Sequence, residues 1–230
     1  MIPGNGNAKE NAGCTAVDYI KDGMVVGLGT GSTVAYTMDQ LAVLIKEGLH
    51  ITGVPTSVQT AMKARERGIQ LASLDDVPWI DVTIDGADQI DPSLRLIKGR
   101  GAAQVRERCV ADASDRLIIV ADESKLCDQL TGPVPVEVIP YALGHVTRRL
   151  TSYGGSVVVR DGVKKDGPVF SDNGNIILDY HSGPIADPEG MESFINNIPG
   201  VVGCGIMTEF APITTVIIGE PDKCRILGLP

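Results

Sequence analysis

The 230-residue sequence is poor in aromatic side chains and has no long apolar run. Phe, Trp and Tyr make up 4% of the chain, whereas hydrophobic residues make up 43%. We therefore expect a core built from Val, Ile, Leu and Ala. A helix that crosses a bilayer needs roughly 20 consecutive apolar residues. Since no segment approaches that length, the sequence predicts no membrane-spanning helix and no membrane partner.

Histidine and paired cysteine are also scarce. The three histidines, His50, His145 and His181, stand alone, and the five cysteines form no CxxC pair. Without an HxH, HExxH or Cys/His cluster, a zinc site is not expected. Asp85 and Asp88 are the one carboxylate pair that could hold Mg²⁺, but we predict no metal. Widely spaced cysteines in odd number are typical of reduced thiols in a cytosolic protein.

The chain carries too little positive charge for a nucleic-acid partner. The chain has 20 Lys and Arg residues and 29 Asp and Glu residues, which gives a net charge of −9. Nucleic acids select basic surfaces, so this class of partner is disfavoured. The first residues, MIPGNGNAKENAG, have neither the basic nor the apolar region of a signal peptide. We therefore expect a cytoplasmic protein that acts on a small molecule.

Apolar strands and amphipathic helices alternate over the first 122 residues. Such alternation predicts right-handed βαβ units and a mostly parallel, Rossmann-like sheet. The expected strands are 24–29, 50–56, 70–74, 80–86, 94–99 and 116–122, and the expected helices are 9–21, 34–48, 57–68 and 102–113.

The pattern changes after the Pro-rich stretch that begins at Thr131. Strand, helix, two strands, helix and strand are expected at 135–140, 141–154, 155–161, 174–181, 187–199 and 200–207. This order predicts an inserted ferredoxin-like α+β domain, with Asn173-Gly174 in the turn before its third strand. We assign residues 1–131 and 207–230 to the Rossmann-like domain and 132–206 to the ferredoxin-like domain. The apolar tail 214–223 is expected to return to the first sheet.

A glycine-rich loop, GLGTGST at 27–33, joins the first strand to a helix. A helix N-terminus attracts anions, and glycines let the backbone approach a ligand closely. The loop has no lysine of a Walker motif, and Ser32 replaces the third glycine of a dinucleotide fingerprint. It therefore suits a single phosphate or a sugar hydroxyl better than ATP or NAD. The alternative is a tight turn with a Ser or Thr cap.

A second polar region, Ile84 to Lys125, follows the ends of buried strands. It contains DGAD from Asp85 to Asp88, KGRG from Lys98 to Gly101, Glu107 in a helix, and DESK ending at Lys125. Carboxylates, ammonium groups and exposed backbone amides together suit proton transfer on an anionic substrate. Glu107 becomes a candidate general base, although a glutamate in mid-helix is more commonly a solvated surface residue.

Taken in order, GLGTGST, DGAD, KGRGAAQVRE, DESK, PVPVEVIP and DNGNIILD resemble the type A ribose-5-phosphate isomerase family. The resemblance runs from about Lys9 to the C-terminal strand. It implies the aldose–ketose interconversion of ribose 5-phosphate and ribulose 5-phosphate in the pentose phosphate pathway. It also implies that no cofactor and no metal take part, and that the protein is a homodimer or homotetramer.

The resemblance assigns roles to residues of this chain. Glu107 corresponds to the base that moves the proton between C1 and C2, Lys98 and the neighbouring amides would stabilise the enediolate, and Asp85 would assist ring opening. The substrate-binding set implied is Lys9, Thr30, Gly31, Ser32, Thr33, Asp85, Gly86, Ala87, Asp88, Lys98, Gly99, Arg100, Gly101 and Lys125.

Arg100 departs from the pattern, because the family usually has glycine at this position. If the position required a positive φ, a non-glycine residue would cost about 1 kcal/mol or more. Otherwise, its guanidinium could add a contact to phosphate or hydroxyl.

Two other functions are compatible with the same pattern. One is another sugar-phosphate enzyme, such as an amino-sugar phosphate deaminase, for which a catalytic histidine would be expected. The other is a sugar-phosphate-sensing regulatory domain without catalysis.

Overall fold

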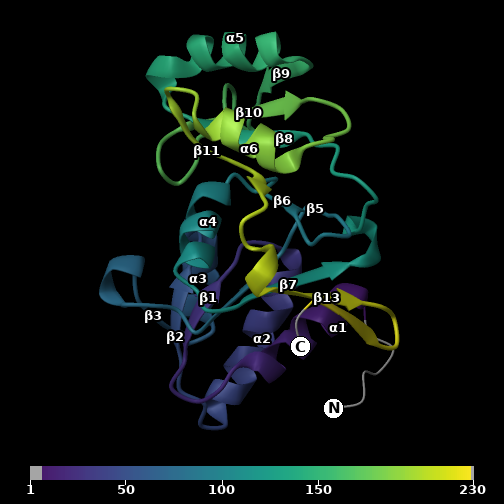
Figure 1. Cartoon of the computed structure of the whole chain (residues 1–230). Coiled ribbons are helices and arrows are strands. Elements are labelled where there is room, and N and C mark those ends of the chain that lie inside the picture. Colours follow the sequence, from purple (N-terminus) through teal and green to yellow (C-terminus); the bar gives the residue numbers. More distant parts are fainter. Residues whose placement is uncertain (1–6, 229–230) are drawn as a thin grey trace. The chain divides into compact units, whose positions relative to one another are not determined.

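The computed structural model describes residues 7–228, which form two compact units (Figure 1). The first unit contains the described residues up to Ala87, Arg106–Leu126, and those from Phe210 onwards. The second contains Asp88–Val105 and Cys127–Glu209. Residues 88–105, which the sequence placed in the first domain, therefore pack with the second unit. The division into domains at residues 131 and 207 stays a prediction, and its ends, 1–6 and 229–230, lie outside the described residues.

A seven-stranded sheet forms the centre of the first unit. Its order is β14-β13-β7-β4-β1-β2-β3, and every strand is parallel to its neighbours except β14, which is antiparallel to β13. The bounds are β1 Val25–Leu28, β2 Thr52–Pro55, β3 Gln70–Leu71, β4 Val82–Asp85, β7 Leu117–Asp122, β13 Thr214–Gly219 and β14 Cys224–Gly228. The Rossmann-like prediction and the return of the tail to this sheet are confirmed.

Helices pack on this sheet through small and aliphatic side chains. They are α1 Ala8–Thr15, α2 Ser32–Lys46, α3 Val58–Glu66 and α4 Gln104–Asp112. The first helix, α1, lies beside β13, which is the second-last strand of the chain (Figure 1). The approach is so close that a Cβ on Gly219 would stand 1.7 Å from the Ala8 carbonyl oxygen. An early and a late segment of the described chain therefore share one core, which includes Ala12, Leu28 and Ile217.

The second unit contains a four-stranded antiparallel sheet of order β11-β8-β10-β9. Its elements are β8 Val134–Val138, α5 Leu143–Tyr153, β9 Ser156–Val159, β10 Ile176–His181, α6 Pro188–Asn196 and β11 Val201–Cys204. The order β-α-β-β-α-β confirms the ferredoxin-like prediction. Gly174 has φ +80° in the predicted Asn173-Gly174 turn, a conformation that favours glycine.

The segment 94–99 does not join the parallel sheet, contrary to the sequence-based expectation. Leu96–Ile97 form β6, which pairs antiparallel with β5, Gln89–Ile90, and with β12, Ile206–Met207. The reason is local. The Asp91 amide donates to the Arg95 carbonyl at 3.1 Å, and Leu94 has φ +61°, so the chain turns back tightly before β6. A similar turn, from the Glu220 amide to the Lys223 carbonyl, starts β14, which the sequence did not predict.

Candidate active site

In the first unit, four parallel strands end side by side and place their following loops at one edge of the sheet. Leu28 at the end of β1 pairs with Pro55 of β2 and with Ile84 of β4, and Asp85 of β4 pairs with Ile119 of β7. The carboxyl edge of a parallel sheet is where α/β proteins bind ligands. GLGTGST, DGA and the DESK segment all leave from this edge.

Asp85 is buried where β4 meets the glycine-rich loop. Asp85 is only 1% exposed, and its Oδ1 accepts hydrogen bonds from the amides of Thr30 at 3.1 Å and Gly86 at 2.7 Å. A Cβ on Gly29 would lie 2.1 Å from the same oxygen. Gly29 is therefore required for the loop to approach the carboxylate, and ligand binding by GLGTGST stays a prediction.

A cluster of hydroxyl groups fixes the Thr30 side chain. Thr30 Oγ1 lies 2.9 Å from Thr56 Oγ1, 2.7 Å from Ser57 Oγ and 3.1 Å from Thr60 Oγ1. Thr60 Oγ1 in turn donates to the Gly29 carbonyl at 2.9 Å, and Ser57 Oγ caps α3 by accepting from the Thr60 amide at 3.0 Å. The loop is thus held rigidly ahead of α2, which begins at Ser32. Ser57 is the N-cap residue of α3.

Asp122, which the sequence did not single out, joins the two lysines predicted to bind substrate. Lys9 Nζ lies 3.9 Å from Asp122 Oδ2, and both Lys9 and Lys125 act electrostatically on this carboxylate. Burial alone would raise the pKa of Asp122, but hydrogen bonds from Ser124 and the two ammonium groups outweigh it and lower the pKa below 3.8. The signal was present in DESK, where Asp122 is positioned to cap the turn that carries Lys125.

Asp122 should make stability depend on pH in the acid range. Because its pKa is lower in the folded state, its stabilising effect is present above pH 3.8 and disappears as pH falls through the lowered value. We expect Asp122→Asn to have a slightly lower Tm than the wild type at pH 7, and a smaller difference at an acid pH below the ordinary pKa of aspartate. Thermal unfolding followed by circular dichroism measures this. A difference of the same size at both pH values would contradict the assignment.

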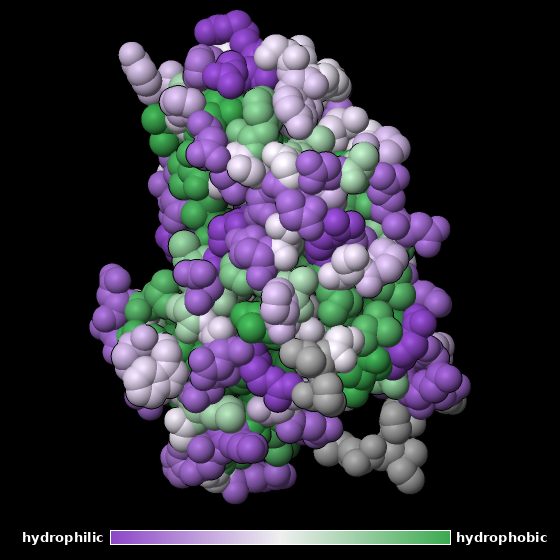
Figure 2. Space-filling view, in the orientation of Figure 1, coloured by the Kyte–Doolittle hydropathy of each residue, from purple (hydrophilic) through white to green (hydrophobic). Residues whose placement is uncertain are grey.

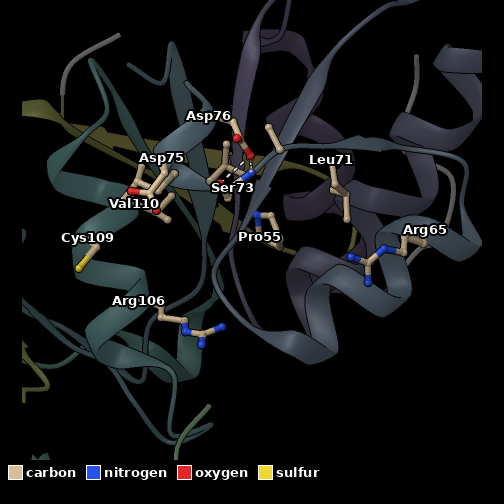
Figure 3. Close-up of a pocket in the computed structure, with 12 residues that line it drawn as sticks. Pro55, Arg65, Leu71, Ser73, Asp75, Asp76, Arg106, Cys109 and Val110 are labelled. Carbon is tan, nitrogen blue, oxygen red and sulfur yellow. Dashed lines mark hydrogen bonds between the residues drawn. The ribbon is translucent and has the colours of Figure 1, made fainter. Parts of the chain in front are cut away.

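Glu107 is buried on α4, with a residue exposure of 4%. The surface-residue alternative is therefore wrong. Its neighbours Arg106, Cys109 and Val110, which share another face of the helix at i, i+3 and i+4, line a pocket of about 620 Å³. Figure 3 shows Arg106 from α4 and Arg65 from α3 extending into this pocket. None of the predicted site residues lines it, so it is separate from the candidate site.

In the second unit, the KGRG loop follows β6 and is held by backbone bonds. Lys98 is 4% exposed, and its amide donates to the Gly205 carbonyl at 2.9 Å. The Arg100 amide donates to Asp88 Oδ2 at 2.8 Å, and Arg100 Nε lies 3.6 Å from Asp88 Oδ1. The second aspartate of DGAD thus anchors the loop.

Positive φ angles in this loop fall on Gly99, at +102°, and on Ala102, at +60°, and not on Arg100. The substitution of glycine by arginine therefore introduces no backbone strain. The Arg100 side chain is 80% exposed.

We expect Arg100→Gly to leave kcat unchanged. The backbone bond to Asp88 remains, and only an exposed ion pair, worth roughly 0–1 kcal/mol, is lost. KM should therefore rise at most a few-fold, as steady-state kinetics would show. A tenfold fall in kcat would mean that the guanidinium itself takes part in the reaction.

The predicted residues fall in both units. The first unit holds Lys9, Thr30, Gly31, Ser32, Thr33, Asp85, Gly86, Ala87, Glu107 and Lys125, and the second holds Asp88, Lys98, Gly99, Arg100 and Gly101. Each unit thus contains at least one predicted carboxylate, at least one predicted lysine and a glycine-containing loop. In the described range, no three His, Cys, Asp or Glu side chains are grouped as metal ligands would be, and no helix is long and apolar enough to cross a membrane.

In the first unit, the buried Asp85 and the glycine-rich loop lie at the carboxyl edge of the parallel sheet, and α4 carries the buried Glu107. The second unit contains the buried Lys98 beside a second glycine-containing loop. Groups of these kinds suit an enzyme that transfers protons on a small anionic substrate. Comparison with known proteins gives the family. Residues 52–223 match the model for "Ribose 5-phosphate isomerase A (phosphoriboisomerase A)". The chain belongs to the ribose-5-phosphate isomerase A family.

Individual relatives match along nearly their whole length. The ribose-5-phosphate isomerase A of Methanoregula boonei is 52% identical over 223 residues, covering 97% of this chain and 94% of the relative. The solved structure from Methanocaldococcus jannaschii has a TM-score of 0.92 at 40% identity, covering 98% of this chain and all of that one. Another D-ribose-5-phosphate isomerase, solved in complex with phospho-erythronic acid, has a TM-score of 0.91 at 45% identity, covering 96% and 98%.

Proposed function

We propose that this chain interconverts D-ribose 5-phosphate and D-ribulose 5-phosphate through an enediolate, as its family membership supports. The single observation that carries the mechanism is the burial of the Glu107 carboxylate on α4. A base that removes a proton next to a carbonyl works best when it is desolvated and its pKa approaches the working pH. Glu107 would carry the proton between C2 and C1.

The remaining roles follow from charge and position. Lys98, buried at the end of β6, would neutralise the enediolate oxygen together with amides of the KGRG loop. Asp85 would assist opening of the sugar ring. Asp88, which already holds the Arg100 amide, would position both the loop and the substrate hydroxyls.

The phosphate would bind near the glycine-rich loop of the first unit. The amides at the start of α2, with the hydroxyls of Ser32 and Thr33, offer donors to an anion. Lys9, which forms an ion pair with Asp122, and Lys125, which acts electrostatically on the same carboxylate, would add positive charge. The relative solved in complex with phospho-erythronic acid supports a ligand that carries a phosphate, and the carboxylate of that acid resembles the negative charge of the enediolate.

An isomerase assay tests the proposal. Purified protein is given ribose 5-phosphate, with and without EDTA, and ribulose 5-phosphate is measured. We expect equal rates in both arms, and competitive inhibition by phospho-erythronic acid. No product would refute the function, and sensitivity to EDTA would refute its independence of metal.

The three histidines argue against the amino-sugar deaminase alternative. His50, His145 and His181 are all exposed, and His50 contacts Asp22 at 3.1 Å. His50 precedes β2 and so lies away from the carboxyl edge of that strand. His50 is therefore not placed at the sheet edge where a catalytic histidine would be needed.

We further propose that the protein is cytoplasmic and forms a homodimer or homotetramer. Figure 2 shows hydrophobic residues in several separate patches between hydrophilic ones on the face in view. The second unit exposes large apolar side chains, among them Tyr141 at 99% and Val163 at 90%, and such surface is typical of contact sites. Light scattering coupled to size-exclusion chromatography measures the mass, and a monomer at assay concentration would contradict the assembly.

A further inference from the structure

We propose that Arg160 and Asp179 form a positioning pair that aims the Gly101 N–H at the oxygen on which the enediolate charge develops. The inference rests on the proposed isomerase function. Arg160 follows β9 and Asp179 lies on β10, far along the chain from the KGRG loop, but both belong with that loop to the second unit.

The contacts of Arg160 divide between a carboxylate and the loop backbone. Its Nε donates to Asp179 Oδ2 at 2.9 Å, and its Nη2 donates to Asp179 Oδ1. Its Nη1 donates to the carbonyl oxygens of Gly99 at 2.9 Å and Arg100 at 3.0 Å. The Arg160 and Asp179 side chains are only 15% and 18% exposed, so the geometry is well shielded from solvent.

A planar trans peptide links each of these carbonyls to the N–H that follows it, and the two point in opposite directions. The Gly99 carbonyl points to Arg160, and the Arg100 N–H of the same peptide points to Asp88 Oδ2. In the next peptide, between Arg100 and Gly101, the Arg100 carbonyl accepts a hydrogen bond from Arg160. The Gly101 N–H of that peptide must therefore point away from Arg160. Within residues 7–228, no hydrogen-bond acceptor is recorded for this N–H.

Holding the carbonyl does two things for the donor. It fixes the direction of the Gly101 N–H before substrate arrives, which is how donors of an oxyanion site gain their effect. A cation on the carbonyl also polarises the peptide and strengthens its N–H as a donor. Because Asp179 accepts hydrogen bonds from two nitrogens of the Arg160 guanidinium, the orientation of this planar group is fixed, and its Nη1 stays directed at the loop. Lysine, a single point charge, cannot reproduce this arrangement.

The competing explanation is that the pair only stabilises the unit. The chain offers a matched control for it. Arg95 forms an equivalent pair in the same unit, with Nε donating to Asp91 at 2.6 Å and a further contact to Glu189 at 3.2 Å. Asp91 is 2% exposed, so loss of Arg95 should destabilise the unit at least as much, without touching the KGRG carbonyls.

The experiment compares Arg160→Met, Arg160→Lys and Arg95→Met in full-length protein by thermal unfolding and steady-state kinetics with ribose 5-phosphate. We expect both Arg160 variants to lose roughly 10- to 100-fold in kcat, the size of effect that a misplaced group produces, with little change in KM. Arg95→Met should keep kcat even if its Tm falls as far. Equal kcat losses in the Arg95 and Arg160 variants, or none in either, would overturn the proposal.

Chemical rescue gives a second readout that does not depend on stability. Arg160→Ala leaves space for a free guanidinium ion between Asp179 and the loop. We expect added guanidinium at sub-denaturing concentration to restore part of kcat in this variant and not in Arg95→Ala. Absence of rescue in a folded Arg160→Ala protein would count against positioning. An inactive wild-type protein would instead refute the proposed function, so the two failures are distinct.

Discussion

Glu107→Gln is expected to lower kcat by roughly 10²–10⁴ while leaving substrate affinity nearly intact, because this is what a general base contributes. Glutamine has almost the same shape as glutamate, so α4 and its packing should persist. It cannot accept the proton from C2, however, and the enediolate cannot form at a useful rate. Steady-state kinetics and calorimetric binding of phospho-erythronic acid to the variant separate the two effects.

Glu192→Gln is the matched control for this substitution. Glu192 is also a buried glutamate on a helix, at 7% exposure, and it accepts hydrogen bonds from the amide and the hydroxyl of Thr208. A glutamine oxygen can accept the same bonds, so kcat should stay at the wild-type value. If Glu107→Gln turned over normally, the base would have to be one of the aspartates.

Lys98→Met should cost roughly 10²–10³ in kcat, the loss seen when one donor to a developing oxyanion is removed. Methionine can occupy the apolar part of the lysine site at the end of β6. The positive charge, however, is lost from a residue that is only 4% exposed, where little water could replace it. The effect should appear mainly in kcat, since the enediolate carries more charge at this oxygen than the substrate does.

Lys165→Met serves as the comparison, because Lys165 is an exposed lysine of the same unit. Its Nζ contacts the Asp166 and Pro168 carbonyls and the Phe170 ring. It should behave as wild type. A Lys98→Met protein with an unchanged kcat and a raised KM would indicate a ground-state contact instead.

The sequence predicted the architecture well because strand and helix periodicities are local signals. Alternating apolar strands and helices gave the parallel sheet, and the order after Thr131 gave the antiparallel one. It failed where two apolar residues form a short strand. Leu96 and Ile97 pair in a separate antiparallel sheet because the chain turns back between Asp91 and Arg95. They also pair with β12, which lies about 110 residues further along the chain, and no local pattern predicts that partner.

Candidate site residues could be selected from the sequence because glycines, carboxylates and lysines gather at the ends of predicted strands, and their roles stay a prediction. The residues that hold them in place could not be selected from the sequence. From the sequence, Asp122 has the pattern of an ordinary turn residue, and its contact with Lys9 is visible only in the structure. Arg160 lies about 60 residues from the loop carbonyls that it contacts, and no pattern in the sequence connects them. The concern about Arg100 was resolved only by its backbone conformation, since the positive φ angles fall on its neighbours.

The central claim, that a protein base moves a proton between C1 and C2, is tested most directly in deuterated water. Ribose 5-phosphate is incubated with the wild-type protein, and the products are followed by proton NMR over many turnovers. The account predicts formation of ribulose 5-phosphate, with deuterium accumulating at C1 of the ketose and C2 of the aldose. Conversion without any deuterium at these carbons would indicate a hydride shift and would contradict it.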